Sequence, residues 1–320
     1  MSRRGWTAVV VLVLWGGGVA ALVRREYFQP NVERLAEAGT RVTPGAVFYA
    51  VLQGTHQVGF ASSTIDTVTG GITSTDYLLA NVDVGGAGQR LQARTRVDVS
   101  RALRLRHFEV DVESDSAPFH AGGRVDGDSV VVYIVSKGAN ATADSTRVRI
   151  DGPVLLPALV PLAIALGEGP AVGKSYVLPV FNPSTMVPSD ARIHVTAETT
   201  FVVNDSSVLD PATKRWRGVQ PDTVRAWRLQ APSGGGIGGI GGIGGWIDAQ
   251  GRVVAGTKMG FRLERRPYEV AYENWRLDTV QDSVAAIAAK QHRLKQSDLA
   301  AGHRAAHRAP PRLLLLTRTP

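Results

Sequence analysis

Most of the chain consists of short stretches in which side chains alternate with a period of two. Residues 46–68 have the sequence AVFYAVLQGTHQVGFASSTIDTV. Within it Val47, Tyr49 and Val51 alternate with their neighbours, and Gly54-Thr55 supplies a turn signal. Because this alternation places successive side chains on opposite faces of a strand, the stretch predicts a β-hairpin.

The same alternation recurs along the chain. Before residue 153 it occurs in TSTDYLLANVDV, QRLQARTRVDVS, LRLRHFEVDVES, HAGGRVDGDSVVVYIVS and TRVRIDG. After residue 174 it occurs in SYVLPVFNP, RIHVTAETTFVV, TVRAWRLQ, GGWIDAQGRVVAGTK and MGFRLERRPYEVAYENW. Turn signals about every 8–12 residues are typical of all-β sandwiches and barrels. We therefore predict an all-β fold, an antiparallel meander forming a half-barrel or barrel-like sheet. Strict alternation also predicts that Leu105 and Phe108 lie on opposite faces.

One apolar run does not alternate. It has the sequence GPVLLPALVPLAIALGEGP, and prolines occur every four residues, at Pro153, Pro157 and Pro161. Such spacing disfavours a long helix, and the 13 residues from Val154 to Leu166 are too few to span a bilayer. We predict a short helical segment that packs on the sheet or caps it. The candidate residues for this lid or apolar-ligand segment are Leu155, Leu156, Leu159, Val160, Leu162 and Ile164. A purely structural role in the core and a role as a ligand gate both remain open.

The N-terminus predicts a membrane anchor. The 19 residues from Gly5 to Val23 carry no charge, and they follow Arg3 and Arg4. As a helix they would extend about 28 Å, close to the ~30 Å of a bilayer core. The basic N-terminal flank favours an orientation with the body outside the cytoplasm. A cleaved signal peptide, with Gly18 and Ala20 as small residues before the cut, is the alternative.

These features predict four regions. Residues 1–25 form the membrane anchor or signal peptide, 26–44 a linker, 45–276 a β-rich extracytoplasmic domain, and 277–320 a helix followed by a disordered basic tail. The predicted location is the cell membrane, which the chain crosses once. The body would then lie outside the cytoplasm, in the periplasm of an organism with two membranes.

The charge distribution argues against nucleic-acid binding. The formal net charge is +8, but an excess of four cations lies in residues 1–25 and an excess of six in residues 290–320. Residues 26–289 therefore carry a net charge of −2, whereas a surface that tracks phosphates needs clustered cations. The predicted partners are the membrane, through the N-terminal helix, and a lipid or an envelope protein.

The residue types offer no recognisable catalytic or metal site. The chain has no cysteine, which removes disulfides, thiolate metal sites and cysteine nucleophiles, and it has no G-x-S-x-G motif. The histidines at 56, 107, 120 and 194 are scattered over different predicted strands, and we expect each to be a surface or packing residue. His303 and His307 have helical spacing but no third ligand. We predict no catalytic, cofactor-binding or metal-binding residue, and hence no enzyme.

A glycine-rich stretch imitates a cofactor motif. GGGIGGIGGIGG contains G-x-G-x-x-G at Gly236/Gly238/Gly241 and again at Gly239/Gly241/Gly244. A dinucleotide-binding turn links a strand to a helix, but here WIDAQGRVVAGTK predicts strand, turn and strand. We therefore expect a flexible connector without a cofactor. An alternative is a loop that inserts into a membrane or partner through Ile237, Ile240 and Ile243.

Several short pieces between residues 44 and 275 resemble a known family. These pieces are Gly54 and Gly59, Gly152-Pro153, Phe181-Asn182-Pro183, and Trp246-x-Asp248-x-x-Gly251-Arg252. They resemble the β-rich exported domain that precedes transglutaminase-like cores in some bacterial membrane-anchored proteins. The resemblance implies a following core with a catalytic Cys, His and Asp, which this cysteine-free chain does not contain.

Together these features predict a non-catalytic, membrane-anchored extracytoplasmic β domain with a binding or scaffolding role. A curved sheet with an apolar segment over one face resembles lipoprotein-carrier architectures, so an apolar ligand or lipid is the candidate ligand. The alternative is a truncated remnant or accessory module of a transglutaminase-like enzyme.

Overall fold

The structure is a computed structural model that describes residues 39–40, 42–84, 87–114, 118–136, 143–183, 185–231, 244–258 and 261–281. The strands are β1 (Gly45–Gln53), β2 (His56–Val68), β3 (Gly71–Val84), β4 (Ala87–Ser100), β5 (Leu105–Ser114), β6 (Phe119–Asp126), β7 (Ser129–Ser136), β8 (Ala143–Arg149), β9 (Ser175–Asn182), β10 (Val187–Leu209), β11 (Trp216–Gln230), β12 (Gly244–Ile247), β13 (Val253–Lys258) and β14 (Phe261–Arg266). The helical elements are a 3₁₀ turn η1 (Pro157–Leu159), α3 (Val160–Leu166) and a C-terminal helix over residues 268–281 that contains the π-helical turn η2 (Glu269–Glu273).

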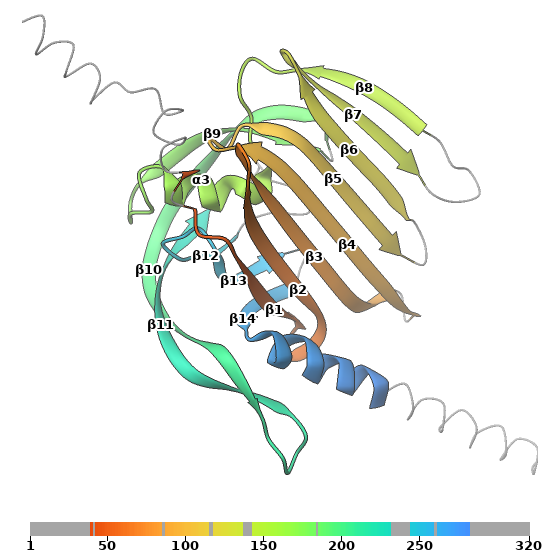
Figure 1. Cartoon of the computed structure of the whole chain (residues 1–320), viewed down its shortest axis with the longest axis vertical. Coiled ribbons are helices and arrows are strands. Elements are labelled where there is room, and N and C mark those ends of the chain that lie inside the picture. Colours follow the sequence, from red (N-terminus) through yellow and green to blue (C-terminus); the bar gives the residue numbers. More distant parts are fainter. Residues whose placement is uncertain are drawn as a thin grey trace, which may run out of the picture.

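All fourteen strands form one antiparallel sheet (Figure 1). Its order is β8-β7-β6-β5-β4-β3-β2-β1-β14-β13-β12-β11-β10-β9, so every neighbour in sequence is a neighbour in the sheet except β8 and β9. The pairing of β1 with β14 joins the first and last strands. The fold is therefore an up-and-down meander that is open between β8 and β9, and the prediction of an all-β, antiparallel, barrel-like sheet is confirmed.

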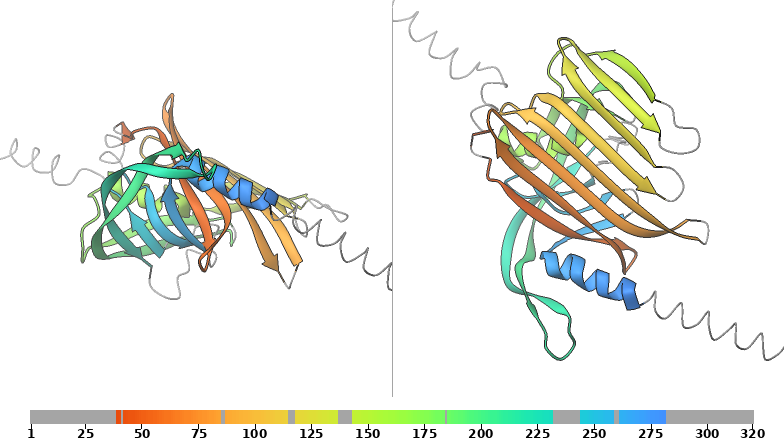
Figure 2. Two further views of the ribbon diagram at one scale, coloured as in Figure 1. Left: turned by 90° about the horizontal axis from the view of Figure 1, so that it is seen from below. Right: turned by 45° about the vertical axis from the view of Figure 1, so that its right-hand side comes forward.

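The sheet curves around an interior core. Seen from below, β9–β11 bend back toward the strands of the other half (Figure 2). Phe108 of β5 and Phe181 of β9 meet in this interior, with ring centroids 6.1 Å apart, and both are fully buried. Because β5 and β9 are far apart in the strand order, this contact shows that the two arms of the sheet face each other.

The apolar run lies where the sheet is open. Leu155 forms a parallel bridge to Val180: its N–H donates to the Pro179 carbonyl at 2.9 Å, and its own carbonyl accepts from the Phe181 N–H at 2.8 Å. The preceding Val154 carbonyl accepts from the N–H of Leu105, which begins β5, at 3.2 Å. The run thus supplies hydrogen-bond partners to part of the open edge of β9. Through Val154 it is also hydrogen-bonded to β5, in the other arm of the sheet.

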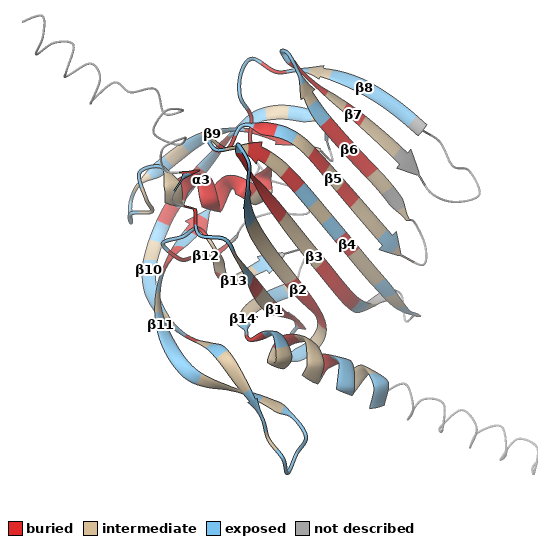
Figure 3. Ribbon diagram, in the orientation of Figure 1, coloured by how far each residue is buried: buried red, intermediate tan, exposed pale blue. Residues whose placement is uncertain are grey.

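The segment formed by η1, which ends at Leu159, and α3 packs into both halves of the core. Leu159 and Leu162 belong to a cluster built on β3–β7, whereas Val160 and Ile164 pack with residues of β9–β12. These four side chains are buried, and Figure 3 shows α3 as one of the most buried segments of the chain. Each fully buried aliphatic side chain contributes roughly 1.5–3 kcal/mol by transfer from water. The prediction that the run packs on the sheet is confirmed.

Strict alternation fails in β5. Asp98 of β4 pairs with His107, but Val99 pairs with Leu105, so Arg106 is an extra residue. This bulge turns both Leu105 and Phe108 toward the core, with exposed fractions of 4% and 0%. The prediction that these two residues lie on opposite faces was wrong.

The C-terminal helix begins earlier than predicted. We expected strand up to Trp275 and helix from 277, but β14 ends at Arg266 and the helix begins at residue 268, directly after Pro267. Tyr268, Ala271, Tyr272 and Trp275 have helical spacing and pack against the convex face of β1–β3. The helix therefore packs on the sheet, and its predicted start at residue 277 was wrong.

Two predicted regions lie outside the described residues. These are the anchor or signal peptide at 1–25 and the basic tail beyond the helix. Within the described ranges, no helix has the length and apolar character needed to cross a membrane.

Candidate functional site

The concave side of the sheet forms a partly open cavity of about 140 Å³. Its walls come from β1–β4, β13 and β14, and from the apolar run at η1 and α3. This is roughly the volume of an apolar cavity that takes up one benzene molecule. The apolar lining residues are Val47, Tyr49, Val51, Ala61, Ile65, Leu78, Ala93, Leu159, Leu162, Val253, Phe261 and Leu263. Ile65, Val253, Phe261 and Leu263 are only half-buried, so the cavity retains accessible apolar surface.

The register explains which side chains face this cavity. Tyr49 pairs with Ala61, Ala61 with Leu78, and Leu78 with Ala93, so these four form one row across β1–β4. All four line the cavity and are buried. Side chains on one face recur every second residue, so the rows above and below this one face the cavity as well.

The adjacent row is polar. Ser63 of β2 lies opposite Asp76 of β3, and Asp76 lies opposite Thr95 of β4. Directly opposite side chains in an antiparallel pair have Cβ atoms about 4.5–5.5 Å apart. All three residues line the cavity and are half-buried. A carboxylate flanked by two hydroxyls thus lies on a mostly apolar concave face.

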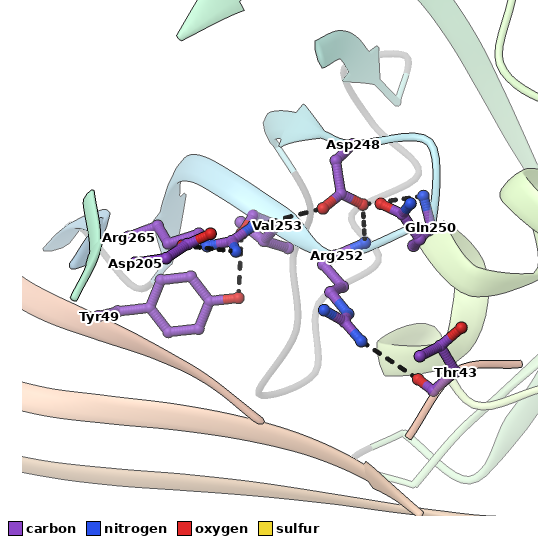
Figure 4. A network of polar contacts seen from close by, with 8 residues as sticks. All are labelled: Thr43, Tyr49, Asp205, Asp248, Gln250, Arg252, Val253 and Arg265. Carbon is purple, nitrogen blue, oxygen red and sulfur yellow. Dashed lines mark hydrogen bonds and ion pairs between the residues drawn. The ribbon is translucent and has the colours of Figure 1, made fainter. Parts of the chain in front are cut away.

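A polar network supports one end of the cavity (Figure 4). Asp248 is 3% exposed, and its carboxylate accepts from the backbone N–H groups of Gln250 at 3.0 Å and Arg252 at 2.8 Å. The Arg265 guanidinium pairs with Asp248 at 3.4 Å and with Asp205 at 3.0 Å. Burial raises the pKa of the Asp248 carboxyl, although the two backbone hydrogen bonds and Arg265 oppose this effect. The network fixes the turn between β12 and β13.

Tyr49 and Arg252 extend this network toward the cavity lining. The Tyr49 hydroxyl donates to the Val253 carbonyl at 3.0 Å, and the Arg252 side chain donates to the Thr43 carbonyl at 3.1 Å. Burial, and next the charge of Asp76, raise the pKa of the Tyr49 phenol. Tyr49 is thus a neutral hydrogen-bond donor that is already engaged with the backbone.

The turn at Gly251 contacts the apolar run. Gly251 has φ +75°, and a Cβ at this position would lie 2.7 Å from the Pro161 carbonyl oxygen. The Asp248 carbonyl accepts from the Gly251 N–H at 3.0 Å. The W-x-D-x-x-G-R motif noted in the sequence therefore builds a tight turn on which η1 and α3 pack.

The structure separates the predicted lid residues into two groups. Leu159 and Leu162 line the cavity, whereas Leu155, Leu156, Val160 and Ile164 are buried in the core away from its lining. Ser63, Asp76 and Thr95 were not predicted as site residues. Their polar neighbours, in SSTID, TSTDY and RTRVD, are typical of a strand face exposed to solvent. Only the strand register assigns the three residues to the concave side.

The four histidines among the described residues lie outside the cavity, whereas His303 and His307 are not among the described residues. His120 Nδ1 is 2.6 Å from Asp111 on the convex face of β5 and β6, and His194 Nδ1 is 2.7 Å from the Ser175 hydroxyl on β9 and β10. In the part of the chain that the structure describes, no group of three His, Asp or Glu side chains has the geometry to hold a metal ion. The expectation that the histidines at 56, 107, 120 and 194 are surface or packing residues agrees with these positions.

Most of the glycine-rich stretch, including its three isoleucines, lies within residues 232–243, which are outside the described residues. The strand β12 that follows pairs antiparallel with β11, as Trp227 opposite Ile247 shows. A dinucleotide-binding turn would open into a helix at this point. The predicted succession of strand, turn and strand is confirmed, although the first strand already begins at Gly244 and not at Trp246.

Comparisons with known proteins identify only distant structural similarity. No protein-family model and no curated protein matches the chain. The β-barrel-like protein of domain of unknown function DUF1849 from Brucella abortus is 11% identical, with a TM-score of 0.43 over 70% of this chain and 94% of that chain. A DUF1089 family protein from Pseudomonas aeruginosa is 14% identical, with a TM-score of 0.31 over 62% of this chain and 89% of that chain. Neither similarity bears on a ligand or an activity, and the resemblance to domains that precede transglutaminase-like cores stays a prediction.

Proposed function

We propose that this chain is a non-catalytic binding domain whose concave cavity takes up the apolar part of a lipid or similar ligand. The observation that carries the proposal is the cavity of about 140 Å³, with walls formed by the inner face of the sheet and by Leu159 and Leu162. Small-molecule sites in proteins are concave, mostly apolar and furnished with a few polar groups. This cavity has that composition, and its size suits one ring or the end of an alkyl chain.

Binding of a neutral apolar dye tests the proposal. N-phenyl-1-naphthylamine fluoresces strongly in apolar surroundings. Its phenyl ring matches the size of the cavity, and the half-buried Ile65, Val253, Phe261 and Leu263 offer apolar surface to the naphthyl group. We therefore expect its emission to rise when the folded domain is added. Thr95→Phe should reduce this signal at least tenfold, because Thr95 lines the cavity and a phenyl group would occupy it. Thr75→Phe is the matched control, since Thr75 lies on the convex face of the adjacent strand and is also half-buried.

The outcome is decisive only if both variants fold, which circular dichroism verifies. Equal dye binding by Thr95→Phe and Thr75→Phe would remove the cavity as the binding site. A wild-type protein that leaves the dye emission unchanged would contradict the proposal altogether.

We further propose that the domain acts outside the cytoplasm and is tethered to the membrane by residues 1–25. Arg3 and Arg4 before 19 uncharged residues support this orientation. A phosphatase reporter that folds only in an oxidising compartment, fused after residue 45, should be active. Activity of a cytoplasm-only reporter at the same position would contradict the proposed topology.

A further inference from the structure

The concave face carries a carboxylate, that of Asp76, which has no partner among the described residues. No hydrogen bond or ion pair joins Asp76 to any described residue, although it is half-buried and lines the cavity. Its cross-strand neighbours Ser63 and Thr95 likewise form no side-chain hydrogen bond with a described residue. Asp98, a half-buried carboxylate on the convex face of β4, is by contrast paired: it accepts from the Thr73 hydroxyl at 2.7 Å and lies 3.4 Å from the Arg96 guanidinium.

The position of Asp76 directs its charge into the cavity. Leu78, two residues along β3 and hence on the same face, is buried beside Val47 and Tyr49. The Asp76 charge also acts on Tyr49, whose ring lines the same space. An acceptor that is half-removed from water gains from a ligand that donates to it, and charge-assisted hydrogen bonds are the stronger kind.

We propose that the cavity selects ligands whose apolar chain ends in a hydrogen-bond-donating cation, such as a primary ammonium group. The Asp76 carboxylate accepts a hydrogen bond from this ammonium, and the hydroxyls of Ser63 and Thr95 accept the others. This inference rests on the proposed function and specifies the ligand class. An ammonium has three donors, and the row offers one carboxylate and two hydroxyls at neighbouring positions. A fatty-acid carboxylate would instead be repelled by Asp76.

The one cation that lines the cavity, among the described residues, is Arg252. Its guanidinium already donates to the Thr43 carbonyl, and it lies against Gly45 at the end of β1. A head group bound at Arg252 would make the cavity prefer anionic ligands, whereas a head group bound at Asp76 would make it prefer cationic ones. The selectivity therefore distinguishes the two positions.

The test measures displacement of N-phenyl-1-naphthylamine by octylamine, octanol and octanoate at neutral pH. These compounds share one alkyl chain and differ only in the head group. We expect octylamine to bind about tenfold more tightly than octanol, a factor that corresponds to about 1.4 kcal/mol, and octanoate to bind most weakly. Asp76→Asn should remove the preference for the amine and leave the affinity for octanol unchanged. Asp66→Asn is the matched control, because it removes the same charge from an exposed position of β2 that does not line the cavity.

Each alternative result has a separate meaning. Binding of all three compounds without a preference, or the same selectivity in Asp76→Asn and Asp66→Asn, would overturn this inference and leave the apolar cavity intact. A preference for octanoate that Arg252→Gln removes would assign the head group to the arginine and also overturn it. Failure of the dye and of all three compounds to bind would reject the proposed function itself.

Discussion

Gly251 lies so close to Leu162 that a Cβ on the glycine would be 2.7 Å from the Leu162 Cα. The two residues come from the β12–β13 turn and from α3, which are far apart in sequence. The contact is between backbones, so a flexible side chain cannot relieve it. It is therefore the point at which the apolar run is positioned against the strands that wall the cavity.

Gly251→Ala should be strongly destabilising. The left-handed backbone alone costs a non-glycine residue about 1–2 kcal/mol, and the close approach to α3 adds to this cost. Gly70→Ala is the control, because Gly70 has φ +77° and nothing within 4 Å of the added Cβ. We expect urea denaturation to show a loss at Gly251 at least about 1 kcal/mol greater than at Gly70. Equal losses would mean that α3 moves freely away from the turn.

Leu159→Asp should prevent folding. Leu159 is 1% exposed and packs with the residues of β3–β7, so the substitution would bury a carboxylate without a partner. Val177→Asp, at a position of β9 that is 58% exposed, should be tolerated. Circular dichroism and size-exclusion chromatography distinguish the two. A folded Leu159→Asp protein would show that the apolar run can detach from the core, as a ligand gate requires.

Much of the fold follows from local sequence signals. Gly54 and Gly127 adopt φ values of +63° and +62° in the hairpin turns that the sequence predicts there. The non-alternating run at 154–166 is buried as its composition requires. These features depend on neighbouring residues only, which is why the pattern of the sequence reveals them.

The faces of the strands could not be assigned in the same way. In β1 both Val47 and Phe48 are apolar, because both faces of the strand are covered. Val47 faces the cavity, and Phe48 packs on the other face against Phe60 and Tyr268 of the C-terminal helix. Alternation gives no inner face when both faces are covered. The polar row at Asp76 and the bulge at Arg106 depend on cross-strand register, which a single strand's sequence does not contain.

The C-terminal helix should contribute substantially to the stability of the β domain. Trp275 is 7% exposed and packs with Phe60, Leu79 and Ala271. Trp275→Ala should therefore destabilise the domain by about 3–5 kcal/mol, which is usual for removal of a buried aromatic side chain. Leu277→Ala, at a position that is 37% exposed, should change the stability by less than about 0.5 kcal/mol. Thermal or urea unfolding measures both, and similar values for the two variants would place the helix outside the folding unit.

The turn at Asp248 should depend on its oxygen atoms more than on its charge. Asp248→Asn keeps an acceptor for the Gln250 and Arg252 N–H groups, whereas Asp248→Ala leaves both without a side-chain acceptor. We expect a loss of about 3 kcal/mol for Ala and about 1 kcal/mol for Asn, since hydrogen bonds to charged groups contribute about 1.5–3 kcal/mol each. Arg265 retains Asp205 as a partner in both variants. Equal losses for Asn and Ala would assign the role to the ion pair with Arg265.

Comparison of the wild type with Asp248→Asn should also reveal a pH-dependent contribution of Asp248 to stability. Burial raises the pKa of the Asp248 carboxyl in the folded state above its value in the unfolded chain, so the folded protein holds this proton more tightly. The contribution is therefore fully present below the ordinary aspartate pKa of about 3.9 and is lost as the pH rises through the higher folded value. Asn does not titrate, and the other carboxyls are common to both proteins. The free energy of unfolding of the wild type minus that of Asp248→Asn should accordingly be greatest near pH 3, fall as the pH increases, and level off at neutral pH. Urea denaturation of both proteins across this range measures the difference. A difference that grows with pH would show that Arg265 and the two backbone N–H groups outweigh burial, and that Asp248 is bound as a favourable carboxylate.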